Sequence, residues 1–176
     1  MIGIRDRLPS TLSTERLVLT TPALAHVGRI AELANNKAVH ANMSRLPFPY
    51  SEDEARFFVD HIARAEDEWN WAIEMEGHFV GAVGLHFQMD ALPVLGFWLG
   101  EPFWGRGIVT EAGQAVVAAA RAAGATGLAS RALKTNVGSL AVQRKLGFAV
   151  VGEEPEHASS NLAGQIMVMT RLDFSP

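Results

Sequence analysis

Hydrophobic and polar residues alternate along several short segments of the chain, a pattern that predicts β-strands with one buried face. In residues 14–21, Leu17 and Leu19 lie on the same side of such a strand. Glu76 and Gly77 form a predicted hairpin turn between the next two strands. The further strands are expected over residues 71–75, 79–87, 94–99, 128–133, 148–151 and 166–172.

Other segments place hydrophobic residues three or four positions apart, which predicts helices with one buried stripe. Residues 23–35 have this spacing. Ser51 and Glu54 fit the capping box that starts a helix, and this second helix is expected to run towards Ala65. Two more helices, each followed by a glycine, are expected over residues 107–123 and 139–146.

The order of these elements predicts a mixed α+β fold. The passage from strand 94–99 through a helix to strand 128–133 is expected to be a right-handed crossover, which makes these two strands parallel. The remaining pairs are then expected to be largely antiparallel. Because the chain has neither internal repeats nor a linker, we expect a single domain over residues 1–176, with residues 1–13 as an N-terminal arm.

Composition narrows the classes of protein that fit. Of the 176 residues 48% are hydrophobic and 19% charged, which is globular and not disordered composition. No apolar run approaches the roughly 18 residues of a membrane span, and the first ten residues contain no apolar stretch long enough for a signal peptide, so a cytoplasmic location without membrane contact is expected. The absence of cysteine excludes disulfides, thiolate metal sites and a cysteine nucleophile.

Charge and histidine spacing argue against two further kinds of partner, nucleic acid and metal ions. The formal net charge of −4 argues against nucleic acid as a partner, so an anionic ligand would need a local binding site. The spacing of the six histidines suggests no metal cluster, and no metal is expected.

A local anion site is expected where strand 94–99 leads into helix 107–123. Gly105 and Gly107 allow backbone conformations that turn successive N–H groups towards one bound group, and the helix dipole adds partial positive charge. The alternative is a tight turn without a ligand. Glu111 lies in the first turn of the helix, where a carboxylate has a structural role through the dipole.

Three passages of the sequence resemble the GNAT family of N-acyltransferases. The first, from Leu95 to Ala112 with Trp-Gly-Arg-Gly-Ile-Val-Thr-Glu-Ala at its centre, resembles the acyl-CoA-binding motif of that family. The second, Asn-Val-Gly-Ser at 136–139 followed by Lys-Leu-Gly-Phe at 145–148, resembles its N-x-x-S…K-L-G-F helix. The third, the TERLVL segment from Thr14 together with Leu-Pro-Phe-Pro-Tyr at 46–50, resembles the Rim-type (RimJ/RimL-like) subgroup, which acetylates ribosomal-protein N-termini.

The resemblance implies the GNAT fold: a twisted, mostly antiparallel sheet of about six to seven strands with helices on both faces. It implies acetyl-CoA as acyl donor, no metal, and direct transfer of the acetyl group to an amine in a ternary complex. Backbone groups of the strand would pair with the pantetheine and the loop would hold the diphosphate. The implied donor-binding residues are Phe97, Trp98, Leu99, Trp104, Gly105, Arg106, Gly107, Ile108, Val109, Thr110, Asn136 and Ser139.

The sequence departs from the family pattern at three positions. Trp104 stands where glutamine or arginine is common, which is usual in the Rim-type subgroup. Val109 stands where glycine or alanine is expected, so either the loop is wider there or the side chain of Val109 turns towards the sheet. Helix 139–146 lacks the tyrosine that many members use as general acid; Tyr50 is the only tyrosine in the chain.

Several polar residues are candidates for catalysis. Ser139 is a candidate proton donor to the departing thiolate, although Asn136 and Ser139 are also suited to cap and begin a helix. Glu101 and His86 are candidate general bases, with an exposed turn residue and a surface strand histidine as the alternative interpretations.

Acceptor specificity is expected in the irregular segment 36–50 and the loop 153–164, with a substrate-binding set of His40, Asn42, Met43, Arg45 and Tyr50. The favoured acceptor is a protein or peptide N-terminal amine. The alternatives are a small-molecule amine such as an antibiotic, polyamine or amino acid, or a non-catalytic acyl-CoA-binding domain. Either a monomer or a homodimer is compatible with the sequence.

Overall fold

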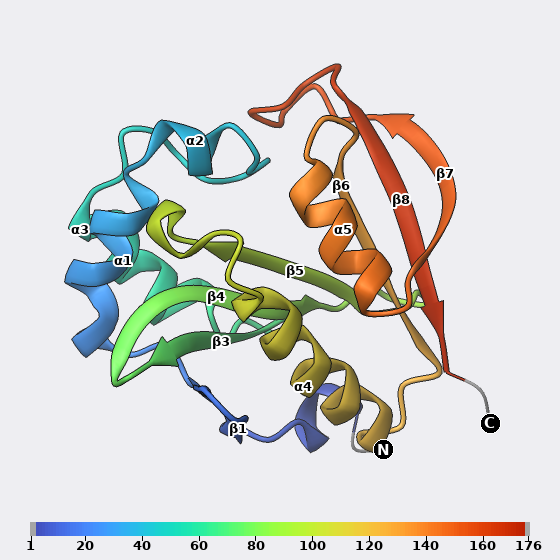
Figure 1. The fold of residues 1–176 in the computed structure, drawn as a ribbon, viewed down its shortest axis with the longest axis horizontal. Helices are drawn as coiled ribbons and strands as arrows, with labels where there is room; N and C mark the ends of the chain where they lie inside the picture. Colours follow the sequence, from blue (N-terminus) through green and yellow to red (C-terminus); the bar gives the residue numbers. More distant parts are fainter. Residues whose placement is uncertain (1–2, 175–176) are drawn as a thin grey trace.

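The computed structural model describes residues 3–174 and consists of one mixed sheet flanked by helices (Figure 1). The sheet has eight strands in the order β1-β2-β3-β4-β5-β6-β8-β7. Every neighbouring pair is antiparallel except β5–β6, which is parallel and is connected through α4. The strands are β1 Leu12–Ser13, β2 Leu17–Thr20, β3 Glu68–Met75, β4 His78–His86, β5 Val94–Leu99, β6 Gly127–Leu133, β7 Ala149–Pro155 and β8 Ile166–Asp173.

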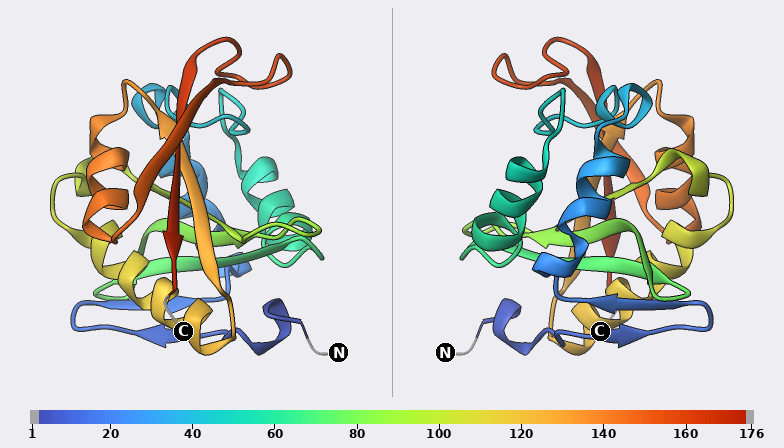
Figure 2. Two further views of the ribbon diagram at one scale, coloured as in Figure 1. Left: turned by 90° about the vertical axis from the view of Figure 1, so that its right-hand side faces the viewer. Right: turned by 90° about the vertical axis from the view of Figure 1, so that its left-hand side faces the viewer.

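Helices cover both faces of this sheet. Figure 2 shows α4 and α5 on one side and α1 with α3 on the other. Each face has its own hydrophobic core: α4 packs on the first with Trp71 and Leu85, and α1 on the second with Ala72 and Phe79. The helices are α1 Val27–Ala34, α2 Lys37–His40, α3 Glu52–Phe57 with a π-turn at Phe58–Ile62, α4 Ile108–Ala122 and α5 Val137–Lys145.

These elements confirm the predicted mixed fold, its mostly antiparallel sheet and its parallel crossover. The capping box is present as well, since Ser51 Oγ accepts from the N–H of Glu54 and the Glu54 carboxylate accepts from the N–H of Ser51. The strand expected over 14–21 is shorter, Leu17–Thr20, and pairs with the two-residue strand β1, which the sequence did not predict. Two residues are too few to show alternation.

The segment expected to be an N-terminal arm packs against the sheet where the structure describes it. Leu8 is buried in the core, and the indole N–H of Trp71 donates to the Pro9 carbonyl at 3.0 Å. Residues 1 and 2 of the expected arm lie outside the described residues. The described part of the arm is therefore a component of the core on the α4 face.

The parallel strands β5 and β6 separate soon after they begin. They pair only at Val94 with Ala129 and Leu95 with Ser130, whereas β5 stays paired with β4 from Val94 to Leu99. Figure 1 shows β5 and β6 diverging beyond this point. The carboxyl half of β5 therefore has a sheet neighbour on one edge only.

Candidate functional site

The free edge of β5 carries unpaired backbone groups on one side of the strand. The N–H of Gly100 donates to the Val80 carbonyl of β4, and the Leu95 carbonyl accepts from Ser130 Oγ of β6. Because backbone groups alternate in direction along a strand, Phe97 and Leu99 face the gap towards β6, whereas Trp98 faces β4. Of the three expected strand residues, Phe97 and Leu99 therefore present their backbone groups to the gap.

The loop after β5 turns sharply at two glycines. Gly105 has φ 72° and Gly107 has φ 74°, the left-handed region in which a side chain is strained. The indole N–H of Trp104 donates to the Leu99 carbonyl at 2.7 Å and so ties the loop to the end of β5. Trp104 thus has a structural contact at the position where the family pattern commonly has glutamine or arginine.

Helix α4 begins directly after these glycines with free backbone donors. Gly107 is its N-cap and offers no side chain to cap it, and the first N–H groups of a helix have no partner within the helix. Ile108 and Val109 are both buried in the core beneath α4, at 1% and 8% exposure. The side chain of Val109 therefore turns towards the sheet and does not crowd the loop.

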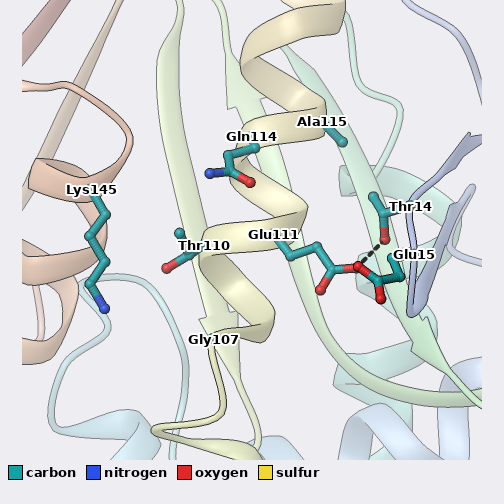
Figure 3. A pocket seen from close by; sticks show the side chains of 8 residues that line it. All are labelled: Thr14, Glu15, Gly107, Thr110, Glu111, Gln114, Ala115 and Lys145. Atoms are coloured by element: carbon teal, nitrogen blue, oxygen red, sulfur yellow. Dashed lines mark hydrogen bonds between the residues drawn. The ribbon is translucent and has the colours of Figure 1, made fainter.

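An open groove of about 610 Å³ lies along the first two turns of α4. Figure 3 shows Thr110 and Gln114 on the side of α4 that faces Lys145 of α5, and Glu111 on the other side, next to Thr14. A second cavity of about 330 Å³ continues between α4 and α5 and is lined by Arg121 and Lys145. Lys145 thus shares the groove with Gly107 and Thr110, whereas Arg121 lies at the other end of α4.

Glu111 has the structural role expected from its place in the helix. Its carboxylate accepts from Thr14 Oγ1 at 2.6 Å, from the backbone N–H of Arg16 at 2.9 Å and from Arg16 Nε at 2.7 Å. Burial opposes its ionisation, but these bonds outweigh burial and lower the pKa of Glu111. Glu111 therefore lines the Thr14 side of the groove, where its carboxylate is paired with Arg16.

Asn136 caps α5, with its Oδ1 accepting from the N–H of Ser139 at 3.1 Å. This bond uses the oxygen of the amide and leaves the Nδ2 group available for another acceptor. Ser139 lies in the first turn of α5, half-buried. Both residues thus occupy the helix that faces the groove.

His86 and Glu101, the two candidate bases, lie at opposite ends of the β4–β5 pair. His86 pairs with Val94 at the start of β5, and its Nδ1 lies 3.1 Å from Glu68 Oε1 of β3. Glu101 follows the end of β5, and its Oε2 accepts from Asn36 Nδ2 at 2.7 Å. Each group has one hydrogen-bond partner, and the carboxylate of Asp67 lies 3.8 Å from His86 Nδ1 as well.

The strand register places His86 beside an open position on the α1 and α3 face. On this face Asn70, Gly84 and Gly96 lie in one row across β3, β4 and β5, with His86 and Trp98 in the rows on either side. Gly96 is exposed, and a Cβ built there would have no neighbour within 4 Å. The missing side chain leaves the backbone of β5 accessible from this face.

The expected acceptor-binding residues lie in different settings. His40 Nδ1 lies 2.9 Å from the Leu46 carbonyl, and Asn42 Nδ2 donates to the Ala38 carbonyl at 2.9 Å, so both stabilise the segment itself. Arg45 reaches Glu68 Oε1 at 3.4 Å. Tyr50 packs into the core on the α1 face, where burial, with a smaller contribution from Glu54, raises its pKa to about 12.

Met43, the remaining expected residue, belongs to a bridge between the two loops expected to select the acceptor. Asn161 Nδ2 donates to the Leu46 carbonyl at 2.6 Å, and the Asn161 N–H donates to the Ser44 carbonyl at 3.0 Å. The Met43 carbonyl lies 3.4 Å from the same Nδ2. We call residues 43–46 together with 160–161 the loop bridge; α2, a four-residue helix capped by Asn36, leads into it and was not predicted.

Sequence reasoning missed residues whose partners lie far away along the chain. Arg16, Glu68, Lys145 and Asn161 each belong to this region, but no local pattern marks them. Arg16 and Lys145 lie within motifs that were noted, in TERLVL and K-L-G-F, without a role being assigned to either. For these two residues, membership of a motif was the sequence signal that could have indicated a role in the site.

The described residues were also compared with the requirements of a metal site and of a membrane-spanning helix. Over residues 3–174, no group of three or more histidine or acidic side chains is arranged to hold a metal ion. Within the same residues, no helix has the length and apolar character needed to cross a membrane.

The family model of the acetyltransferase (GNAT) domain matches residues 16–149 of this chain. The match includes β2, the glycine loop, α4 and α5, and so covers most of the region described above. No curated protein sequence matches the chain.

Solved structures share the whole fold at low sequence identity. The microcin C7 self-immunity acetyltransferase MccE, solved with acetyl-CoA and AMP, is 19% identical with a TM-score of 0.84, over 96% of this chain and 98% of that one. RimL, the ribosomal L7/L12 α-N-protein acetyltransferase solved with coenzyme A, is 19% identical with a TM-score of 0.82, over 95% and 97%. A Salmonella typhimurium acetyl transferase that modifies the N-terminal serine of L7/L12 is also 19% identical, with a TM-score of 0.80 over 96% and 99%.

Proposed function

Because the chain belongs to the GNAT acetyltransferase family and is an acetyl-CoA-dependent N-acetyltransferase, we propose that its acceptor is the α-amine of a protein or peptide N-terminus. The observation that carries the proposal is the meeting of the free β5 edge, the glycine loop and the uncapped start of α4 at one gap in the sheet. A thioester whose diphosphate binds at the loop places its acyl end beside Phe97. The open position at Gly96 then admits an amine from the opposite face.

Donor binding in this proposal uses backbone groups in the gap and positive charge beyond it. The N–H groups from Gly105 to Thr110 would hold the diphosphate, and the backbone of Phe97 and the N–H of Leu99 would pair with the pantetheine. Lys145 lines both the groove and the second cavity, and Arg121 lines the second cavity, where the nucleotide end would lie. The Leu99 carbonyl is already bonded to Trp104, and Trp98 faces β4, so neither takes part.

The transfer step needs one proton acceptor and one proton donor. The amine nitrogen attacks the thioester carbonyl carbon, the C–S bond breaks, and coenzyme A leaves as the thiolate. We assign proton removal from the amine to His86, because Glu68 holds its Nδ1 and leaves Nε2 for the substrate beside Gly96. Ser139 donates a proton to the thiolate in place of the absent tyrosine.

The pKa values of amines favour an N-terminal acceptor. A peptide α-amine has a pKa of about 7.7 to 8.0, whereas a lysine amine has a pKa of about 10.4 and is almost fully protonated at neutral pH. An α-amine therefore loses its proton more readily than a lysine amine, and His86 is a sufficient base for it. Two of the similar structures, RimL and the Salmonella enzyme, act on the N-terminus of ribosomal protein L7/L12.

A small cationic amine is the second candidate acceptor. The carboxylates of Asp67, Glu68 and Glu101 lie along the proposed acceptor side, and negative charge attracts a polyamine or an aminoglycoside. The similar MccE structure contains AMP, a small molecule, beside acetyl-CoA. A non-catalytic domain has less support. One of the two observations that suggest it is Val109 in the loop motif, and this side chain points into the core.

Thiol release from acetyl-CoA across a panel of amines tests the proposal. The panel contains peptides with free N-termini, the same peptides with blocked N-termini and an internal lysine, and a set of aminoglycosides and polyamines. We expect turnover with the free N-termini only. Turnover confined to the small amines would support the second candidate, and acetyl-CoA binding measured by calorimetry without any turnover would contradict catalysis.

A further inference from the structure

The TERLVL segment and the start of α4 are joined by a set of bonds that the proposed function does not use. Thr14 and Arg16 both bond to Glu111, as described above, and Arg16 Nη1 also donates to the backbone carbonyl of Arg106 at 3.2 Å. Arg106 is the residue between the two loop glycines. One guanidinium therefore contacts both the first turn of α4 and the loop in front of it.

The bond to Arg106 determines which way the next peptide group faces. A trans peptide is planar, and its C=O and N–H point in opposite directions. Since the Arg106 carbonyl points to Arg16, the N–H of Gly107 in the same peptide points away from Arg16. Gly107, with φ 74°, is the N-cap of α4, so its N–H group lies at the junction of the glycine loop and the helix.

Among the residues that line the groove, the acidic side chains Glu15 and Glu111 lie on the Thr14 side of α4 and Lys145 on the other, so an anion is favoured on the side away from Arg16. Glu111, which Arg16 contacts, lies on the Thr14 side of α4, whereas Thr110, Gln114 and Lys145 lie on the other side (Figure 3). The Arg16 charge is itself compensated by Glu111 at 2.7 Å. Its contribution to the loop is therefore one of orientation more than of net charge.

We propose that Arg16 is a positioning residue for the acyl donor: by bonding the Arg106 carbonyl, it turns the Gly107 N–H towards the diphosphate. This inference rests on the proposed binding of acetyl-CoA at the glycine loop. It gives the TERLVL motif a role in donor binding, although the motif lies 90 residues from Arg106 in the chain.

Comparison of two donors separates this role from a general loss of structure. S-acetylpantetheine carries the same thioester and pantetheine as acetyl-CoA but lacks the diphosphate and the nucleotide. We expect Arg16→Met to raise the Kd and KM for acetyl-CoA roughly tenfold, the size of one lost hydrogen bond, and to leave kcat/KM for S-acetylpantetheine unchanged. Arg16→Lys keeps the charge but not the two-sided contact, and should lose donor affinity to the same extent.

The matched control is Arg171→Met, which removes an exposed arginine from an ion pair with Asp173 on β8. It is expected to leave both donors unaffected. Equal losses for both donors in Arg16→Met, or full recovery in Arg16→Lys, would overturn the inference while leaving the proposed function intact. Wild-type protein that binds no acetyl-CoA would contradict the proposed function and this inference together.

Discussion

At the scale of single residues, the loop glycines combine a backbone requirement with a binding role. Gly105 in the loop and Gly77 in the β3–β4 turn form a matched pair, because both have positive φ and neither has an atom within 4 Å of a built Cβ. Alanine at either position is expected to lower the free energy of unfolding by about 1 kcal/mol, the strain of a left-handed residue.

Only the loop variant should affect the donor. In Gly105→Ala the strained backbone redirects the neighbouring N–H groups, so we expect weaker acetyl-CoA binding by calorimetry, whereas Gly77→Ala binds as the wild type does. Chemical denaturation of both variants verifies that their stabilities match. Equal donor affinities for the two variants would place the diphosphate elsewhere.

Some features of the site could be predicted from single residues in the sequence, and others could not. The glycines predicted the sharp turn because few other residues adopt positive φ. The direction of the Val109 side chain was not predictable, since it depends on where the core lies relative to the start of α4. The burial of Tyr50 was equally hidden, because the segment before α3 has no periodic pattern.

At the scale of elements, one side chain at the start of α5, Asn136, is both the helix cap and a candidate contact for acetyl-CoA. Asn136 Oδ1 caps the helix, and its Nδ2 is the group that would hold the cofactor arm. Asn136→Asp keeps the capping oxygen but replaces the N–H groups of Nδ2 with a negatively charged oxygen. Asn136→Ala removes both the capping oxygen and the N–H groups. The two variants therefore separate the structural role from the binding role.

We expect Asn136→Ala to lower the free energy of unfolding by about 1 kcal/mol, the usual value of a lost cap, and Asn136→Asp to stay near the wild type. Both variants should bind acetyl-CoA more weakly. Denaturation curves and calorimetry provide the two measurements. If Asn136→Asp binds the donor as well as the wild type, Asn136 serves only as a cap.

Elements with a repeated pattern were predictable, and short ones were not. Helix α4 and strand β5 matched the sequence to within a residue at most ends, because alanine-rich and β-rich runs extend over their whole lengths. Strand β1 and helix α2 contain two and four residues, which is too short for a strand or helix pattern to repeat. Their bounds depend on pairing with β2 and on the Asn36 cap instead.

At the scale of the whole molecule, the proposed site is assembled from contacts between distant parts of the chain. Arg45 and Glu68 are separated by 23 residues, Arg16 and Glu111 by 95, and Asn161 and Leu46 by 115. No local sequence pattern encodes such pairs. The separation of β5 from β6 belongs to the same scale, since it depends on how far two strands pair after the crossover.

The loop bridge offers a test of how the two halves of the molecule form the acceptor side. Asn161→Ala removes the Nδ2 bonds to the carbonyls of Leu46 and Met43, and the loosened bridge then holds the acceptor less precisely. We expect the KM for the acceptor peptide to rise several-fold, while the Kd for acetyl-CoA does not change, because the bonds lost from Asn161 lead to Met43 and Leu46 and not to the glycine loop. Ser159→Ala, at an exposed position in the same loop, is the control. A rise in the donor Kd with an unchanged acceptor KM would show that the bridge supports the donor side, and would move acceptor recognition away from residues 43–46.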